Sequence, residues 1–144
     1  MNLVISKCEK AVANQLSLTS NGAVPIYVSD VDGVKDPMPY IVIHGNSYEE
    51  QIGPGSGIFK IRMDCVFRSH VKGLGSAPDE ARDAAVTWIN NFLYSDPKSA
   101  LSASTGFHCY GFVPVSGEMR VQGDYKAYEY HTQFDVFCMP RDNE

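Results

Sequence analysis

Residues 58–70 read IFKIRMDCVFRSH, a stretch in which apolar and polar side chains alternate along nearly the whole length. When the chain is extended, one side carries the apolar residues Phe59, Ile61, Met63, Cys65 and Phe67. A period of two is typical of a strand that has one face on a core and the other in water. We therefore predict a strand here, with Lys60, Arg62 and Arg68 on the face that points outward.

A helix is predicted after this strand. Residues 76–79 read SAPD, and a proline in the first turn beside an acidic residue suits the positive end of a helix dipole. An apolar stripe with helical spacing then continues as far as Leu93. The dipeptide Asp96-Pro97 ends the helix, and the Ser/Ala-rich stretch up to Thr105 is predicted to be a loop.

The remaining chain is predicted to be all strand. Residues 106–115 and 118–122 flank the dipeptide SG, which suits a tight hairpin turn. Residues 126–139 then form a long strand, again with one apolar and one polar side. The polar side carries Glu129 and Asp135, which we expect to be exposed.

The N-terminal part supplies a helix and two shorter strands. Apolar residues at steps of three and four predict an amphipathic helix over residues 2–18. A short β-prone run follows at residues 26–28, and a second strand at residues 40–44 begins after Pro39. Proline is tolerated at such a position because a strand start or a sheet edge does not need its missing N–H group.

A glycine-rich segment separates the second strand from the third. Residues 46–57 end in GPGSG and are predicted to form a long mobile loop that carries Glu49 and Glu50. Glycines alternate at its end, but the Lys and Ser/Thr of a phosphate-binding loop are absent. Such a segment fits a loop that becomes ordered only against a neighbouring subunit.

Together these segments predict an α+β fold with the element order α, β, β, β, α, β, β, β. The expected architecture is a single, mainly antiparallel sheet with two helices packed on its apolar face. The chain has 144 residues, the usual size of one domain. We therefore predict a single domain over residues 1–144.

The charge balance and the hydropathy exclude two classes of protein. Lys and Arg number 12 against 17 Asp and Glu, which gives a net charge of -5. An acidic chain offers no basic surface for phosphate contacts, so we exclude an ordinary nucleic-acid-binding domain. The longest apolar runs are strand-sized and fall far short of the roughly 18 residues of a membrane span. The N-terminal residues lack the apolar core of a secretory leader, and we expect a soluble protein.

No recognisable motif for catalysis, metal binding or a cofactor occurs in the sequence. The cysteines are Cys8, Cys65, Cys109 and Cys138. They form no CxxC pair, and we predict that they are buried reduced thiols. His131 has the best surroundings for acid–base chemistry, because Glu129 and Asp135 share its strand face. We predict no catalytic residue and no cofactor, with a small enzyme built around His131 and a monomeric binding module as the alternatives.

Five short stretches carry a family resemblance. They are residues 25–28 (PIYV), 37–43 (PMPYIVI), 66–69 (VFRS), 80–85 (EARDAA) and 92–93 (FL). In their order and spacing they resemble the tail terminator, or tail completion, family of long-tailed bacteriophages and the related neck proteins. The similar region covers residues 1–95, and the strand-rich remainder fits the α+β sheet of that family.

The resemblance implies a structural virion protein and not an enzyme. Proteins of this family form a hexameric ring that caps the tail tube, stops its polymerisation and docks to the head connector proteins. DNA passes through the lumen of such a ring without specific binding, and no membrane is involved. The implied location is the head–tail junction of a virion that is assembled in the host cytoplasm. A neck or head–tail adaptor, or another tail component, is the alternative.

In such a ring, exposed charged side chains would line the lumen or the contacts between subunits. A negative lumen would repel DNA phosphates and let the genome slide through. We assign this interface or lumen role to charges on the glycine-rich loop and on the polar strand faces. The candidates are Glu49, Glu50, Lys60, Arg62, Arg68, Glu129 and Asp135.

Overall fold

The computed structural model describes residues 2–20, 24–28, 40–51, 57–70, 77–122 and 127–139. Its elements are α1 (Asn2–Ser20), β1 (Ile26–Val28), β2 (Tyr40–Glu50), β3 (Phe59–His70), α2 (Ala77–Leu93), α3 (Lys98–Thr105), β4 (His108–Gln122) and β5 (Ala127–Met139). The predicted α+β class is confirmed, since helices and strands build one sheet with a helical layer against it.

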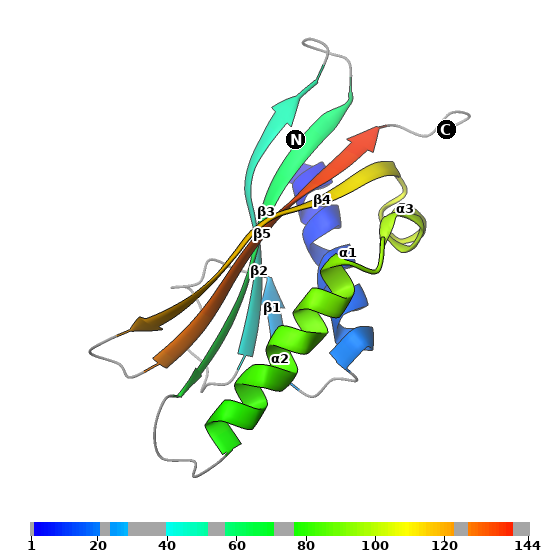
Figure 1. Cartoon of the computed structure of the whole chain (residues 1–144). Coiled ribbons are helices and arrows are strands. Elements are labelled where there is room, and N and C mark those ends of the chain that lie inside the picture. The colour runs from blue at the N-terminus through cyan, green and yellow to red at the C-terminus, as the bar shows by residue number, and fades with distance from the viewer. Residues whose placement is uncertain are drawn as a thin grey trace.

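The sheet has five strands in the order β1-β2-β3-β5-β4. The neighbours β2/β3, β3/β5 and β5/β4 are antiparallel, and β1 pairs with β2 in parallel. The sheet is therefore mainly antiparallel, as predicted, and β2 and β3 extend as a long hairpin at the upper end of the view in Figure 1. The strand predicted from residues 58–70 lies in its centre, where both edges are paired.

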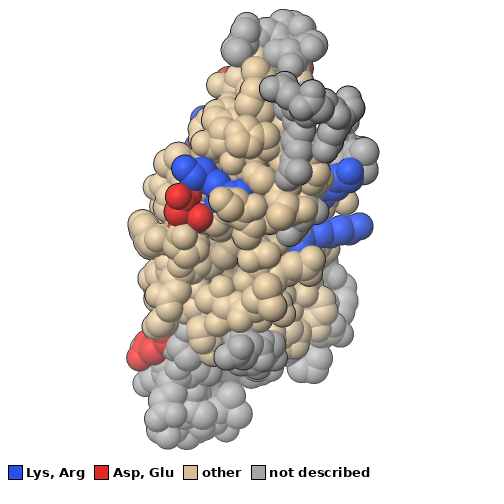
Figure 2. Space-filling model, turned by 90° about the vertical axis from the view of Figure 1, so that its right-hand side faces the viewer, with Lys and Arg blue, Asp and Glu red and all other residues tan. Residues whose placement is uncertain are grey.

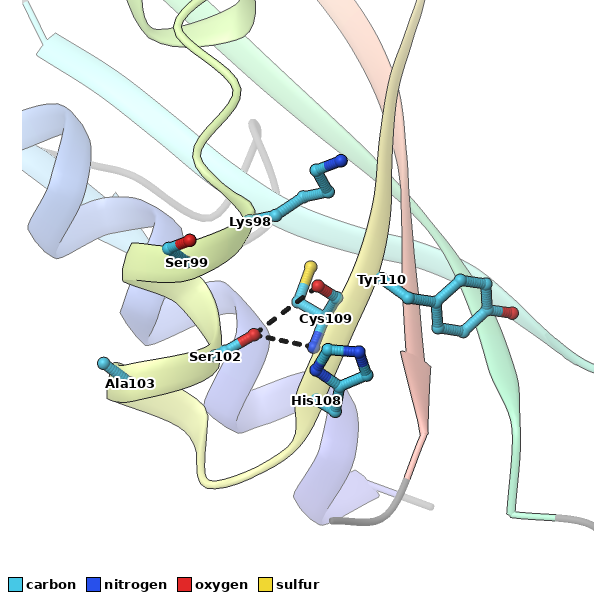
Figure 3. A pocket seen from close by; sticks show the side chains of 7 residues that line it. All are labelled: Lys98, Ser99, Ser102, Ala103, His108, Cys109 and Tyr110. Carbon is cyan, nitrogen blue, oxygen red and sulfur yellow. Dashed lines mark hydrogen bonds between the residues drawn. The ribbon is translucent and has the colours of Figure 1, made fainter. Parts of the chain in front are cut away.

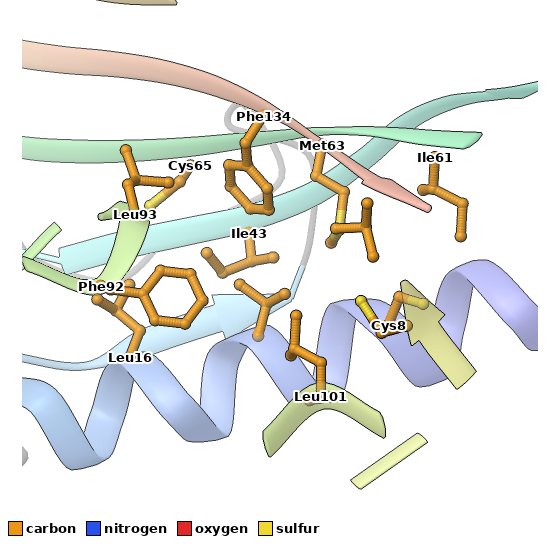
Figure 4. Close-up of a cluster of buried hydrophobic side chains, with 14 of the residues drawn as sticks. Cys8, Leu16, Ile43, Ile61, Met63, Cys65, Phe92, Leu93, Leu101 and Phe134 are labelled. Carbon is orange, nitrogen blue, oxygen red and sulfur yellow. The ribbon is translucent and has the colours of Figure 1, made fainter. Parts of the chain in front are cut away.

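All three helices lie on one side of this sheet (Figure 1). The core between the two layers is apolar, with Leu16 of α1, Leu101 of α3 and Phe134 of β5 fully buried (Figure 4). The β3 residues on this face are the apolar residues that the sequence pattern predicted to face the core: Phe59, Ile61, Met63, Cys65 and Phe67. None of the helices in the described part of the chain combines the length and the hydropathy needed to cross a bilayer.

The four cysteines are free and buried, which confirms the prediction of reduced thiols. Three of them meet in the core, where the sulfur atoms of Cys8 and Cys138 lie 3.6 Å apart and Cys109 is paired with Cys138 across β4 and β5. Cys65 lies elsewhere on the same face of the sheet, and burial raises the pKa of its thiol to about 12. Thiols in such surroundings stay protonated and unreactive.

The contact of α1 with β2 depends on Gly45. A Cβ atom added at this position would lie 2.4 Å from Cγ2 of Ile5, which is far inside van der Waals contact. The backbone N–H of Gly45 donates a hydrogen bond of 2.8 Å to Oε2 of Glu9 on α1. Glycine at this position leaves room for the Ile5 side chain to pack directly on the strand backbone.

The structure corrects the prediction of two helices, because the stretch expected to be a loop forms α3. This helix begins after Pro97, whose carbonyl accepts a hydrogen bond of 2.9 Å from the N–H of Leu101. It ends at Gly106, which adopts the left-handed conformation with φ of 79°. Leu101 is the one large apolar side chain in the helix, so the sequence lacks the repeated apolar spacing that would reveal it.

Two loop boundaries are also corrected. No hairpin turn occurs at Ser116-Gly117, because β4 continues through both residues and pairs with β5 along its length. Register shifts near Gly111 and Pro114 absorb the extra residues. The start of the predicted glycine-rich loop belongs to β2, where a shift between Gly45 and Ser47 lets the strand stay paired with β3 as far as Glu50. Residues 52–56 and Pro39 lie outside the described residues.

Candidate functional site

The uncovered face of the sheet carries most of the candidate residues. Lys60, Arg62 and Arg68 alternate along β3 with core residues, so their side chains lie on the face away from the helices. In the register of β3 with β5, Arg62 is directly opposite Asp135 and Arg68 is directly opposite Glu129. The equal spacing of the two cations and the two acids therefore makes two charge pairs in a single antiparallel alignment.

Asp135 forms the first of these charge clusters. Its two carboxylate oxygens accept hydrogen bonds from Nε and Nη2 of Arg62 at 3.0 and 3.1 Å, and Nζ of Lys60 lies 3.8 Å from Oδ2. The hydrogen bond with Asp135, followed by the attraction of its charge, raises the pKa of Arg62. This two-pronged geometry is the preferred way in which a guanidinium holds a carboxylate.

Glu129 forms the second cluster, which is more deeply buried. Its Oε2 atom accepts hydrogen bonds from the guanidinium of Arg68, and its Oε1 atom lies 2.8 Å from Nε2 of His131. Nη1 of Arg68 also donates to the hydroxyl of Tyr40 at 2.9 Å. Burial alone would lower the pKa of Arg68, but the hydrogen bonds with Tyr40 and Glu129 outweigh it and raise that pKa.

The expected exposure of Glu129 and Asp135 is wrong. Glu129 is 2% exposed and Asp135 is 5% exposed, and each carboxylate is neutralised by at least one cation. The alternation assigned both acids to the correct face of the sheet, but side chains on a polar face are not necessarily exposed to solvent. Neither acid presents its charge to solvent in the isolated chain, although a role at an interface stays a prediction.

The other two acids lie at the end of β2. Glu49 is exposed, opposite Lys60 in the register of β2 with β3. Glu50 is partly buried, and its Oε2 atom accepts a hydrogen bond of 3.0 Å from the N–H of Gly57. Both residues belong to an ordered strand and not to the mobile loop that the sequence predicted.

His131 lies beside a carboxylate, but that carboxylate also binds an arginine. Its carboxylate partner, Glu129, is shared with Arg68 and is almost fully buried. His44 lies on β2, with β3 between it and β5, and its Nδ1 atom is 3.9 Å from Oε2 of Glu9, so His44 and His131 lie beside different acids. The described part of the chain also contains no group of three or more side chains able to hold a metal ion.

A pocket of about 600 Å³ lies between α3 and the start of β4 (Figure 3). Its lining consists of Lys98, Ser99, Ser102, Ala103, His108, Cys109 and Tyr110. The Ser102 hydroxyl accepts a hydrogen bond of 2.8 Å from the Cys109 N–H and donates to the Cys109 carbonyl at 3.5 Å. Ser102 therefore joins helix to strand, while the ring of Tyr110 points to the other side of β4 (Figure 3).

The edge of β4 exposes a group of apolar side chains that sequence reasoning missed. Tyr110 is 41% exposed, Val113 is 49% exposed and Val115 is 42% exposed. The sequence predicted a strand here, but alternation cannot tell an edge strand from a central one. Figure 2 views the molecule from the side that is on the right in Figure 1, and few of the described side chains in this view are charged.

Comparisons with known proteins show a similarity of fold and not of sequence. No protein-family model and no curated protein sequence matches this chain. A chain from the virion of a native gene transfer agent particle matches with a TM-score of 0.55 and 12% identity, over 90% of this chain and 92% of that chain. At this identity the match shows a shared fold.

Two structures from Akkermansia muciniphila match more weakly. A crystal structure has a TM-score of 0.41 and 8% identity, over 99% of this chain and 88% of that chain. A protein solved without its transmembrane region has a TM-score of 0.37 and 7% identity, over 99% of this chain and 95% of that chain. These scores are too low to support a conclusion.

Proposed function

We propose that this chain is a structural protein of a phage-like virion, and that it acts as a tail terminator. In this role, copies of the chain form a ring that caps the tail tube, stops its polymerisation and docks to the head connector. The observation that carries the proposal is the likeness to a chain of the gene transfer agent virion over nine-tenths of both chains. The resemblance of residues 1–95 to the tail terminator family points the same way.

The charge clusters of the uncovered face suit a structural role better than a catalytic one. The Asp135 and Glu129 carboxylates are both bound by arginines on the neighbouring strand. Such pairs tie β3 to β5 and favour a single register of the two strands. A general base, by contrast, would need a carboxylate or imidazole that can reach a substrate.

Of the four candidate acids, we keep only Glu49 and Glu50 at the end of β2 as lumen residues. Glu129 and Asp135 are buried and paired, so they contribute little repulsion toward DNA. Glu49 is exposed and Glu50 is partly buried, so these acids are more accessible to solvent than Glu129 and Asp135. We assign these two acids to the lumen or to its rim, where an overall chain charge of -5 adds to the effect.

Light scattering over a series of concentrations, with negative-stain images of the same samples, tests the ring. We expect a species with a mass near six times 15.9 kDa and a central hole. Addition of this species to polymerising tail tube subunits from the same particle should give shorter tubes with capped ends. The charge reversals Glu49→Lys and Glu50→Lys should slow the passage of DNA through the rings that the variants form.

Two outcomes would replace the proposal. A ring that binds head connector proteins and leaves tube length unchanged would identify a neck adaptor. A chain that stays monomeric at every concentration and does not bind tube ends would identify a monomeric binding module.

A further inference from the structure

The sheet has an incompletely covered edge at each end. On one side, β1 pairs with β2 only from Ile41 to Ile43, and no described strand pairs with that edge of β2 farther along. On the other side, β4 is the last strand of the order, and no described strand pairs with its outer edge. Edges of this kind are templates for pairing with another chain.

The uncovered segments of these two edges lie at the same height of the sheet. Following the cross-strand pairs through β3 and β5, Ser47 shares a line with Val113, and Glu49 shares a line with Gly111. The same pairs put Gly45 on the line of Pro114. Residues 46–50 on β2 and 108–113 on β4 are therefore matching segments at opposite edges.

At the height of Gly45 and Pro114, neither edge offers a free backbone N–H group to another strand. The N–H of Gly45 is already bound by the carboxylate of Glu9, and Pro114 has no N–H to donate. Below this height, β1 covers the edge of β2 at residues 41–43. β4 continues beyond Pro114 to Gln122, but the part of β2 at that height is covered by β1. Both edges are therefore open at the same height only at the end of the sheet where Glu50 and His108 lie.

The strand directions also match. The three antiparallel pairings from β2 to β4 make β4 run opposite to β2. A second copy placed beside the first without being turned over would bring its β2 next to β4 in antiparallel fashion. Such a head-to-tail contact uses two different surfaces, so it can close into a ring.

The β4 segment also exposes large apolar side chains. Tyr110 is 41% exposed and Val113 is 49% exposed, and both lie on the uncovered face of the sheet, where Ser47 of β2 also lies. If the sheets join without one copy being turned over, Ser47 of one copy would lie beside Val113 of the next on the uncovered face. The contact would cover part of this apolar surface.

We propose that residues 46–50 of one copy pair with residues 108–113 of the next copy, so that the sheets of adjacent subunits join edge to edge. The proposal rests on the proposed function in taking a second copy of this chain as the partner. It adds which two edges meet, in which direction, and where the pairing ends.

Disulfide trapping between introduced cysteines tests the contact, because the four native cysteines are buried. The double variant Ser47→Cys, Val113→Cys is oxidised at millimolar protein concentration and run on a denaturing gel without reductant. Each new bond joins two thiols, whose two hydrogens pass to the added oxidant, diamide. We expect a ladder of covalent species at multiples of 15.9 kDa, since every subunit then carries both halves of the contact.

Mixtures of single variants define the geometry. Ser47→Cys mixed with Val113→Cys should stop at the dimer, and neither variant should cross-link to itself. The matched control, Ser47→Cys with Tyr94→Cys, uses a residue that is 75% exposed and lies beyond the end of α2, and should give at least tenfold less product. Self-cross-linking of Val113→Cys, or no ladder from the double variant, would overturn the proposal.

A charge placed on the edge gives an independent readout. Val113→Lys should reduce the assembled mass to 15.9 kDa, while Tyr94→Lys should leave it unchanged. Circular dichroism and thermal unfolding would confirm that both variants fold, which the exposure of both positions favours.

The two proposals fail separately. A ring that caps tubes but gives no ladder would reject the edge pairing and leave the terminator function standing. A ladder from a chain that never affects tube length would support the edge pairing and reject the terminator function.

Discussion

The two faces of the sheet are stabilised in different ways, although the same alternation of residues produces both. On the helix-covered face, apolar side chains such as Ile61 and Phe134 are fully buried and pack without polar partners. On the uncovered face, Glu129 is buried just as deeply but is held by Arg68 and His131. The comparison teaches that alternation assigns a residue to a face, whereas the residue opposite it on the next strand decides whether its charge is exposed.

The largest effect is expected on the covered face. Phe134 is fully buried, with its ring stacked on Phe112 at 4.9 Å and edge-on to Phe92 at 6.3 Å. Phe134→Ala should lower the free energy of unfolding by about 4 kcal/mol, because it removes apolar contact and leaves a cavity. Urea denaturation followed by circular dichroism measures the loss. A loss below about 1 kcal/mol would mean that this face is loosely packed.

A somewhat smaller effect is expected from the buried acid on the uncovered face. Glu129→Ala should cost about 3 kcal/mol, because it leaves the guanidinium of Arg68 without its anionic partner. The double change Arg68→Met with Glu129→Leu should recover most of that loss, since a well-packed apolar pair avoids the desolvation of two charges.

Urea denaturation of both variants measures how much of the lost stability the double change recovers. If the double variant is as unstable as Glu129→Ala, the cluster acts through its shape and hydrogen bonds and not through charge balance. The comparison between the two faces would then have to be drawn on packing alone.

Alkaline pH should weaken the covered face through Cys65. Burial raises the pKa of its thiol from 9.0 to about 12. Below pH 9 the thiol is protonated in both states, so its full contribution to stability is present. Between pH 9 and 12 it ionises only in the unfolded chain, and the free energy of unfolding should fall by about 1.4 kcal/mol per pH unit.

Denaturation at pH 8, 9 and 10 in the presence of reductant measures that slope. Tyrosines, lysines and the other thiols add slopes of their own, so the quantity of interest is the difference from Cys65→Ala. The variant should start from a lower stability and lose less of it as the pH rises. Equal slopes for the two proteins would contradict the assignment to Cys65.

The sequence was sufficient for the central strands and the longer helices, because their period of two or of three to four spans many residues. It was insufficient for α3, where Leu101 is the one large apolar side chain, and for the continuous β4, where Ser116-Gly117 imitates a turn. In the candidate site, the face of each residue could be predicted, whereas its burial could not.

One signal for that burial was present in the sequence. Arg62 and Arg68 are separated by the same distance along β3 as Glu129 and Asp135 are along β5. In an antiparallel pair, equal spacing lets both cations meet both acids in one register. This equal spacing predicts the ion pairs only if β3 and β5 are known to be neighbours, and that depends on the strand order and not on the local sequence.

The smallest effect is expected from the shallower cluster, and it decides how far the two faces differ. The Arg62 side chain is 36% exposed while the Asp135 side chain is 7% exposed, so solvent screens the pair only in part. A double-mutant cycle with Arg62→Met and Asp135→Asn should give a favourable coupling free energy that falls as salt is raised. Asp96 and Lys98 provide the control, since both side chains are more exposed and their atoms lie 3.5 Å apart. Their coupling should be below about 0.3 kcal/mol. If the two cycles give equal values, the bidentate geometry of Arg62 adds nothing, and Glu129 alone distinguishes the uncovered face from an ordinary charged surface.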